Sequence, residues 1–190
     1  MPDKQIAAVP FSRIWDSYPS DPPCIDKTGK PPLGWDNQCA VRLGVALARS
    51  GVSFASFPLG GRCPVGPSSG PMIGSAQRVA DWLKTHPFPG CSRPQIIPSG
   101  GWESALNGRT GIVFFKDYWR RQGETNGAGT GDHIDLWNRS KRTPSIQTFL
   151  RFTLGISSFP NLNPFSRSED NPNWFSDLGK SSQIWFWSVS

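Results

Sequence analysis

The chain has 190 residues and a formal net charge of +6, with nineteen prolines and twenty glycines. A chain of this length is most simply one domain over residues 1–190, and its nine tryptophans and twelve phenylalanines supply apolar area for a core. The positive charge favours an anionic partner, but the basic residues occur as pairs such as Arg120-Arg121, so nucleic-acid binding is not predicted. No stretch approaches the ~18 apolar residues of a membrane span, which excludes membrane insertion.

The amino terminus and the cysteines bear on compartment and cofactors. The first ten residues lack the long apolar region of a signal peptide, so synthesis in the cytoplasm without general secretory export is expected. The four cysteines show neither CxxC nor zinc-ligand spacing, and with only two histidines no metal site and no cofactor is predicted. Cys63 and Cys91 lie in loops rich in glycine and proline, which favours a disulfide between these two, while the pairing among Cys24, Cys63 and Cys91 stays open.

The first half of the chain has the patterns of helices separated by long loops. Residues 10–18 carry aromatic and aliphatic side chains at helical spacing and predict a short amphipathic helix. Residues 19–34 form a loop, and residues 52–74, rich in glycine and proline, predict an irregular surface excursion. Ser75 is the expected N-cap of a further helix that runs to about Lys84.

Between these two loops lies a predicted helix that opens with a cysteine. Apolar residues are almost continuous from 40 to 47, which indicates a buried helix that ends at Gly51. Asn37 is the predicted N-cap, so Cys39 falls in the first turn. Unpaired N–H groups and the helix dipole favour negative charge there and lower the pKa of a thiol. An inert buried cysteine gives the same pattern, so a nucleophile requires a partner histidine.

The second half of the chain has the patterns of strands. Residues 111–116 form a continuous apolar run typical of a central strand buried on both faces. The glycine-rich residues 123–131 form a connection that lacks the Lys-Ser/Thr of a phosphate-binding loop. Residues 133–138 alternate as a strand does, and residues 183–188 form an aromatic strand. Helices first and strands afterwards, without βαβ alternation, predict an α+β fold with an antiparallel sheet.

His133 and Asp135 are candidate partners of Cys39. The two-residue period of a strand places both on one face, with Ile134 and Leu136 on the other. A sheet face packed against the start of the Cys39 helix would bring His133 to the thiol. An imidazole there deprotonates the thiol and later protonates the leaving amine, and a third polar group orients the ring. The other histidine lies in a proline-rich turn, so His133 is the predicted base.

Four blocks of this sequence, in this order, carry a family resemblance. They are Trp35-x-Asn37-x-Cys39-Ala40-x-Arg42-Leu43, Gly111-Ile112-Val113-Phe114-Phe115, Gly131-Asp132-His133-Ile134-Asp135-Leu136-Trp137 and Ile184-Trp185-Phe186-Trp187. Together they resemble the type VI secretion amidase effectors, and among these the fourth family. The resemblance runs from about Phe11 to Trp187, and its Cys-Ala-x-Arg-Leu and His-Ile-Asp-Leu-Trp blocks are specific in combination.

The resemblance implies a papain-like, NlpC-type fold in which N-terminal helices carrying the cysteine pack on an antiparallel sheet carrying the histidine. It implies cleavage of peptidoglycan stem peptides between D-glutamate and meso-diaminopimelate, with Cys39 as nucleophile and His133 as base. Family members complete a Cys-His-Asp triad, and their Asp can come from the strand after the histidine. Residues 141–147 contain no Asp. Asp135 is then the available carboxylate, with Ser145 or Gln147 as alternatives.

Substrate contacts are expected beside the nucleophile. The tetrahedral intermediate carries an oxyanion, which the Cys39 backbone N–H and a second donor would bind. Trp35, Asn37 and Gln38 are the nearest side chains that can frame this position.

The resemblance also implies how the protein is used. It predicts an antibacterial toxin that type VI secretion machinery delivers to the periplasm of a target bacterium, and a cognate immunity protein that occludes the cleft. The periplasm would tolerate a disulfide. Two alternatives remain: a phage-type or other cell-wall amidase with a different bond preference, and a non-catalytic, tryptophan-rich wall-binding module.

Overall fold

A computed structural model describes residues 7–67, 69–119, 130–139, 141–142 and 178–190. Its elements in chain order are α1 (Phe11–Asp16), α2 (Cys39–Arg49), α3 (Ala76–Thr85), β1 (Gln95–Ile97), α4 (Trp102–Leu106), β2 (Arg109–Trp119), β3 (Gly131–Arg139), β4 (Lys141–Arg142), η1 (Leu178–Lys180) and β5 (Gln183–Ser188). The three predicted helices and the three predicted strands are confirmed, whereas β1, α4, β4 and η1 were not predicted. Much of the predicted glycine-rich connection, as well as Ser145 and Gln147, lies outside the described residues.

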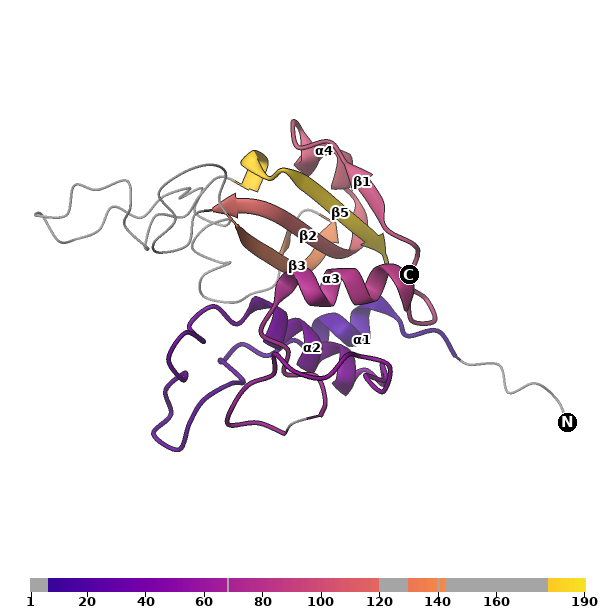
Figure 1. The fold of residues 1–190 in the computed structure, drawn as a ribbon. Helices are drawn as coiled ribbons and strands as arrows, with labels where there is room; N and C mark the ends of the chain where they lie inside the picture. Colours follow the sequence, from indigo (N-terminus) through magenta and orange to yellow (C-terminus); the bar gives the residue numbers. More distant parts are fainter. Residues whose placement is uncertain (1–6, 68, 120–129, 140, 143–177) are drawn as a thin grey trace, which may run out of the picture.

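The five strands form one sheet in the order β1-β5-β2-β3-β4, in which every neighbouring pair is antiparallel. The carboxyl-terminal strand β5 lies between β1 and β2, so it is an inner strand of the sheet (Figure 1). Phe114 on β2 pairs with Trp185 on β5 and with Ile134 on β3. The predicted α+β class with an antiparallel sheet is confirmed.

Both faces of the sheet are covered, and each face has its own core. Ile112 and Phe114 of β2 join residues of α1, α2 and α3 in one apolar cluster, whereas Val113 and Phe115 join residues of α4 and η1 in the other. Figure 1 shows α2 and α3 below the sheet and α4 above it. The continuous apolar run of β2 is therefore explained by burial on both faces.

The faces of β3 are used differently from the prediction. Ile134 and Leu136 point into the cluster that contains α2 and α3. His133 instead contacts Phe115 and Tyr118, which belong to the opposite cluster. The expectation that the His133 face packs on the helices is therefore wrong, because the aliphatic residues of β3 complete the core beneath the helices.

Helix α2 is buried along most of its length, and it ends as predicted with Gly51 at φ 98°. Its beginning differs by one residue from the prediction. The N-cap position is occupied by Gln38, and the Asn37 side chain accepts a long hydrogen bond of 3.5 Å from the Cys39 N–H. Cys39 is thus the first residue of the helix. Within the helix, a Cβ on Gly44 would lie 2.0 Å from the carbonyl oxygen of Pro71, so the loop before α3 can approach closely only at a glycine.

A disulfide joins Cys24 to Cys63, which corrects the expected pairing of Cys63 with Cys91. Both bonded cysteines pack around Val41 on the outer side of α2, and Trp35 and Met72 lie against them. Cys91 is held elsewhere, in an isolated bridge with Val189 just beyond β5, and its thiol is free. The glycine and proline content around Cys63 and Cys91 did not predict the correct partner of Cys63. The distance between Cys24 and Cys63 depends on how their two loops fold over α2.

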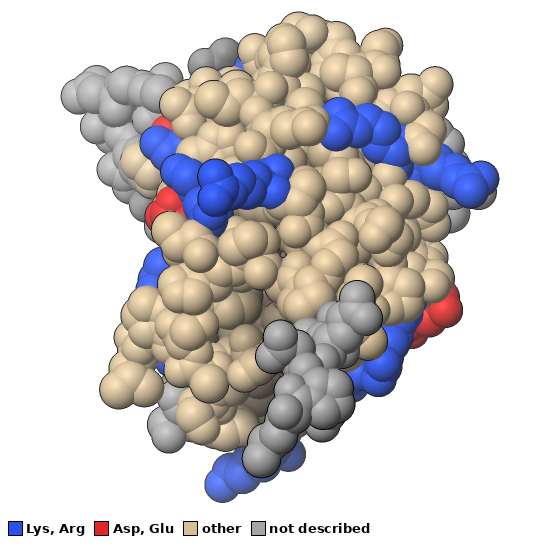
Figure 2. Space-filling model, turned by 90° about the vertical axis from the view of Figure 1, so that its right-hand side faces the viewer, with Lys and Arg blue, Asp and Glu red and all other residues tan. Residues whose placement is uncertain are grey.

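The surface agrees with the positive net charge. On the face shown in Figure 2, lysine and arginine side chains form several separate groups and predominate over acidic side chains. None of the helices in the described part of the chain has the length and apolar character needed to cross a bilayer.

Candidate active site

Cys39 and His133 are brought together at the free edge of β3. The Cys39 side chain hydrogen-bonds His133, and the backbone of Ile134 also hydrogen-bonds the sulfur. β4 pairs with β3 only at Trp137 and Asn138, so no other described strand covers β3 at His133. The start of α2 therefore occupies the edge position, and the thiol reaches a histidine that alternates onto the far face of the sheet.

The two groups shift each other's titration in opposite directions. Burial alone would raise the pKa of the Cys39 thiol, but the charge of His133 and the hydrogen bonds from His133 and Ile134 outweigh burial, and the pKa is lowered. Burial also opposes protonation of His133, yet the charge of Cys39 and the interactions with Asp135 and Cys39 raise its pKa to about 9. Both shifts favour the thiolate–imidazolium form of the pair.

Asp135 lies behind the imidazole, and its side chain is fully buried. Its Oδ2 is 3.5 Å from Nε2 of His133, the separation of an ion pair rather than of a short hydrogen bond. Its Oδ1 accepts a hydrogen bond of 2.8 Å from the Leu136 N–H, which fixes the carboxylate. His133 therefore interacts with Cys39 as well as with Asp135. The three residues form a chain in the order Cys39, His133, Asp135.

Two aromatic rings enclose the imidazole, and one of them escaped the sequence analysis. Phe115 and Tyr118 both have ring centroids 6.3 Å from that of His133, tilted for Phe115 and edge-on for Tyr118. Phe115 faces His133 because the two are paired across β2 and β3. Strict alternation along β2 would place Tyr118 on the other face, so no sequence signal marks it.

The three predicted substrate-binding residues, Trp35, Asn37 and Gln38, have different surroundings. Gln38 is 3% exposed, and its amide donates to the Cys24 carbonyl at 2.7 Å and accepts from the Cys24 N–H at 2.8 Å. The Gln38 side chain therefore holds the backbone of Cys24 against the start of α2. Asn37 is exposed beside Cys39, while Trp35 is half-buried with its six-membered ring over Gly74. Of the three, Asn37 and Trp35 have surface that a substrate can reach.

The other histidine, the other free cysteine and the acidic residues have different surroundings from the Cys39–His133 pair. In that part of the chain, no group of three His, Cys, Asp or Glu side chains is arranged to hold a metal ion. His86, the second histidine, lies beyond the end of α3, where its ring stacks on Trp82 and its Nδ1 contacts the Thr85 hydroxyl. Cys91, the second free cysteine, has its pKa raised to about 12 by burial. Neither forms a Cys-His pair.

Comparison with known families identifies the chain. Residues 35–187 match the family described as "Type VI secretion system (T6SS), amidase effector protein 4", or Tae4. The chain belongs to the Tae4 family. The matched region begins at Trp35, includes Cys39, His133 and Asp135, and ends at Trp187 within β5, so the resemblance found in the sequence blocks is confirmed. The protein is thus an amidase effector of type VI secretion.

A solved structure of the Tae4 family has the same fold. The crystal structure of the type VI effector Tae4 from Enterobacter cloacae aligns with a TM-score of 0.52, covering 97% of this chain and 98% of that chain. The sequences are only 13% identical, so this similarity supports the fold alone. A comparison with curated proteins gave no match.

Proposed function

We propose that this chain is a peptidoglycan amidase that cleaves stem peptides between D-glutamate and meso-diaminopimelate by a Cys-His thiol mechanism. The observation that carries the proposal is the hydrogen-bonded pair of Cys39 and His133 at the start of α2, in a chain of an amidase effector family. A cysteine that opens a buried helix and a histidine on a neighbouring strand are the arrangement of papain-like, NlpC-type peptidases. Residues 1–190 act as a single catalytic domain.

The first half of the reaction uses the ion pair directly. The Cys39 thiolate attacks the carbonyl carbon of the scissile amide, and the carbonyl oxygen becomes an oxyanion. When this intermediate collapses, the carbon–nitrogen bond breaks, and the leaving amine of diaminopimelate takes the proton of the His133 imidazolium. The D-glutamyl carbonyl is then a thioester on Cys39, and His133 is neutral.

The second half restores the enzyme. Neutral His133 takes a proton from water as the water oxygen attacks the thioester carbonyl. The carbon–sulfur bond breaks, and the thiolate–imidazolium pair is formed again. The D-glutamyl product leaves as a carboxylic acid that loses its proton to the solvent and becomes a carboxylate. The Asp135 carboxylate, 3.5 Å from Nε2, holds the imidazole and stabilises its positive form, as the carboxylate of a triad does.

Oxyanion binding is assigned to the residues at the start of α2. The Cys39 N–H has only a long hydrogen bond to the Asn37 carboxamide oxygen, which a substrate oxygen can replace. The Trp35 indole N–H is the candidate second donor, because Trp35 is half-buried and no hydrogen bond engages its indole among the described residues. Gln38 frames the site from below through its bonds to Cys24.

The family and the net charge support a proposed biological setting. Type VI machinery delivers the protein into the periplasm of a target bacterium, where peptidoglycan is the anionic partner that the net charge of +6 favours. The separate basic groups in Figure 2 match a polymer contacted at many points. A cognate immunity protein protects the producer by covering the site at the start of α2.

The decisive experiment is digestion of purified peptidoglycan followed by mass spectrometry of the released fragments. The wild type should release fragments that end in D-glutamate, Cys39→Ala should release none, and Cys91→Ala should match the wild type. Cys91 is the matched control because it is the other free cysteine and its raised pKa keeps it a thiol. Fragment release by Cys39→Ala at the wild-type rate would refute the nucleophile assignment.

The same digestion separates the alternatives. Fragments cut at another bond would assign the chain to a cell-wall amidase with a different preference. Retention on the wall without any fragment, by wild type and Cys39→Ala alike, would indicate a wall-binding module.

A further inference from the structure

The pairing of β2 with β3 is interrupted beside the candidate base. Between the pairs Phe115–His133 and Trp119–Gly131, the register advances four residues along β2 but only two along β3. This irregularity is a β-bulge, a feature that re-aims side chains and is over-represented next to active sites. It lies within two residues of His133 along β3.

Asp117, in the middle of this bulge, has a backbone conformation that is unusual for its residue type. Its φ is 52°, and Arg139 is the only other non-glycine residue with positive φ in the described part of the chain. Such residues persist only where the surrounding structure holds them, and they cluster at functional sites. We therefore expect surrounding contacts to hold the Asp117 backbone in this conformation.

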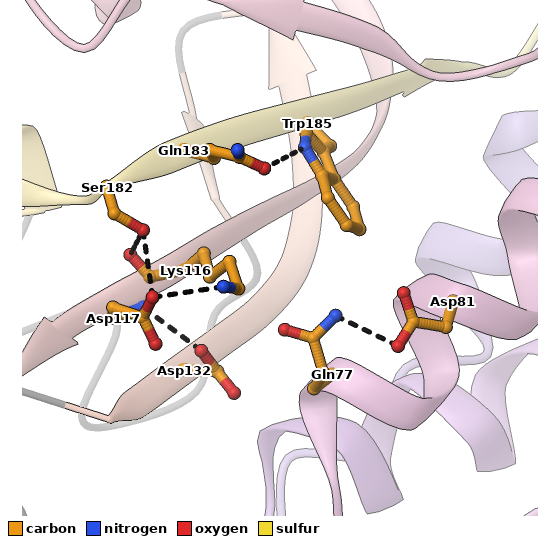
Figure 3. Close-up of polar contacts among 8 residues, drawn as sticks. All are labelled: Gln77, Asp81, Lys116, Asp117, Asp132, Ser182, Gln183 and Trp185. Atoms are coloured by element: carbon orange, nitrogen blue, oxygen red, sulfur yellow. Dashed lines mark hydrogen bonds and ion pairs between the residues drawn. The ribbon is translucent and has the colours of Figure 1, made fainter.

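The bulge is held from the strands on both sides of β2 (Figure 3). The Asp117 N–H donates to Oδ1 of Asp132 on β3 at 3.0 Å. On the β5 side, the Ser182 hydroxyl donates to Oδ2 of Asp117 at 3.0 Å, and the Ser182 N–H donates to the Lys116 carbonyl at 2.9 Å. Nζ of Lys116 pairs with the same carboxylate oxygen at 3.1 Å. Asp132 is also the chain neighbour of His133, so the bulge and the base share one anchor.

The consequence of the bulge is the position of Tyr118. Regular alternation would place Tyr118 with Phe114 on the helix side of the sheet. Instead it is buried in the opposite cluster with Phe115, and its ring meets His133 edge-on. The extra residues of β2 thus carry an aromatic ring from one face of the sheet to the other, where it lies against the imidazole.

We infer that Tyr118 is a positioning residue for His133 and that the bulge at Asp117 places the Tyr118 ring against the imidazole. Phe115 and Tyr118 limit rotation of the imidazole, so that one nitrogen stays on Cys39 and the other on Asp135. Without the Tyr118 ring the imidazole gains other orientations, and its hydrogen bond with the thiol is made only part of the time. The inference rests on the proposed function only in taking His133 as the base.

The test measures alkylation of Cys39 by iodoacetamide as a function of pH, which needs no wall substrate. Tyr118→Ala should move the midpoint of the acid limb up by about one pH unit, because a thiol that loses part of its contact with an opposite charge regains a higher pKa. Tyr118→Phe keeps the ring and should keep the wild-type midpoint. On peptidoglycan, Tyr118→Ala should lose kcat by ~100-fold with little change in KM, the size of loss that a misplaced catalytic group produces.

A second pair of variants tests the bulge itself. Asp117→Ala removes the carboxylate that binds Ser182 and Lys116, and it should shift the alkylation midpoint in the same direction as Tyr118→Ala. Asp117→Asn accepts positive φ and keeps an acceptor, so it should restore most of the wild-type behaviour. Arg139→Ala is the matched control, because Arg139 has positive φ in the same sheet at the far end of β3.

The outcomes are separable. A lowered melting temperature with an unchanged alkylation midpoint in both Tyr118→Ala and Asp117→Ala would make Tyr118 ordinary core packing and overturn the inference. An equal shift in Arg139→Ala would trace the effect to general loosening of the sheet and overturn it as well. If the wild type releases no wall fragments but the midpoint still shifts as expected, the proposed function fails and the positioning role stands.

Discussion

At the scale of single residues, the proposed reactivity comes from two groups whose charged forms burial alone would disfavour. Burial opposes the charge on both Cys39 and His133, and their mutual attraction overcomes that cost. Cys91 shows the contrast within the same chain. Without a positive partner, burial raises its pKa to about 12 and leaves it an inert thiol.

The pair predicts a bell-shaped pH dependence for wall hydrolysis. Activity should rise as the Cys39 thiolate forms on the acid side, and fall as pH passes about 9, where His133 loses the proton that the leaving amine needs.

The raised pKa of His133 also stabilises the folded state. This contribution to the free energy of unfolding is complete below about pH 6.5 and is lost as pH rises through about 9.

Alkylation measured on the same samples is the control for this profile. Iodide leaves without a proton, so alkylation of Cys39 should persist above pH 9 while hydrolysis declines. Parallel decline of both rates would show that unfolding, and not deprotonation of His133, limits the alkaline side.

The orienting carboxylate gives a graded prediction. Asp135→Asn keeps the size of a buried side chain but removes the charge that holds the imidazolium, so turnover should fall less than in His133→Ala. Rates of fragment release by the two variants, with circular dichroism to verify folding, decide the order. Wild-type activity in Asp135→Asn would transfer the orienting role to the 143–147 segment, where Ser145 and Gln147 are the candidates.

At the scale of elements, the start of α2 is held by contacts that do not touch the substrate. Gln38 binds the backbone of Cys24 at both ends of its amide, and the Arg42 guanidinium donates to the Pro19 carbonyl at 3.0 Å. The 19–34 loop is thereby fastened to the first turn of the helix. Since Cys39 follows Gln38 directly, these hydrogen bonds also determine the position of the Cys39 thiol.

Loss of the Gln38 amide should therefore affect both stability and chemistry. Gln38→Leu keeps an apolar side chain of similar length but leaves the buried Cys24 N–H and carbonyl unpaired, which should lower the free energy of unfolding by ~1–3 kcal/mol. Thermal unfolding measures this loss, and the pH midpoint of Cys39 alkylation measures movement of the thiol. Gln77→Leu on α3 is the control, because it removes an exposed hydrogen bond of the Gln77 amide to Asp81 within the same helix (Figure 3). Equal stability of the two variants would contradict the role of Gln38.

At the scale of the whole molecule, a single sheet separates two cores, and a disulfide secures the loops on the helix side. The Cys24–Cys63 bond joins residues 39 positions apart, and it lies next to Val41 on α2. The covalent link therefore joins the 19–34 loop to the 52–74 loop beside α2. The oxidising periplasm proposed as the site of action is where such a bond persists.

Removal of the disulfide should lower stability by about 2–5 kcal/mol, the usual range for a native bond in a small domain. Thermal unfolding of the Cys24→Ser, Cys63→Ser double variant should show this loss, and a reductant should lower the melting temperature of the wild type but not of the variant. Cys91→Ser should leave the reductant effect intact, because Cys91 is not bonded. A wild-type melting temperature that ignores reductant would contradict the stabilising role.

The sequence by itself determined the elements whose burial is written into local patterns. The apolar run of α2, the Ser75 cap of α3 and the strands around Phe114, Ile134 and Phe186 were all predictable, because periodicity and capping act over a few residues. The blocks that carry Cys39 and His133 were likewise sufficient to indicate the family.

Only the tertiary structure decided which faces meet. It placed the helices on Ile134 and Leu136 rather than on His133, paired Cys63 with Cys24, and turned Gln38 toward the Cys24 backbone. It also moved Tyr118 across the sheet through a bulge that alternation does not anticipate. These outcomes depend on contacts between segments far apart in the chain, and a local pattern contains no information about which distant surface completes a core or an edge.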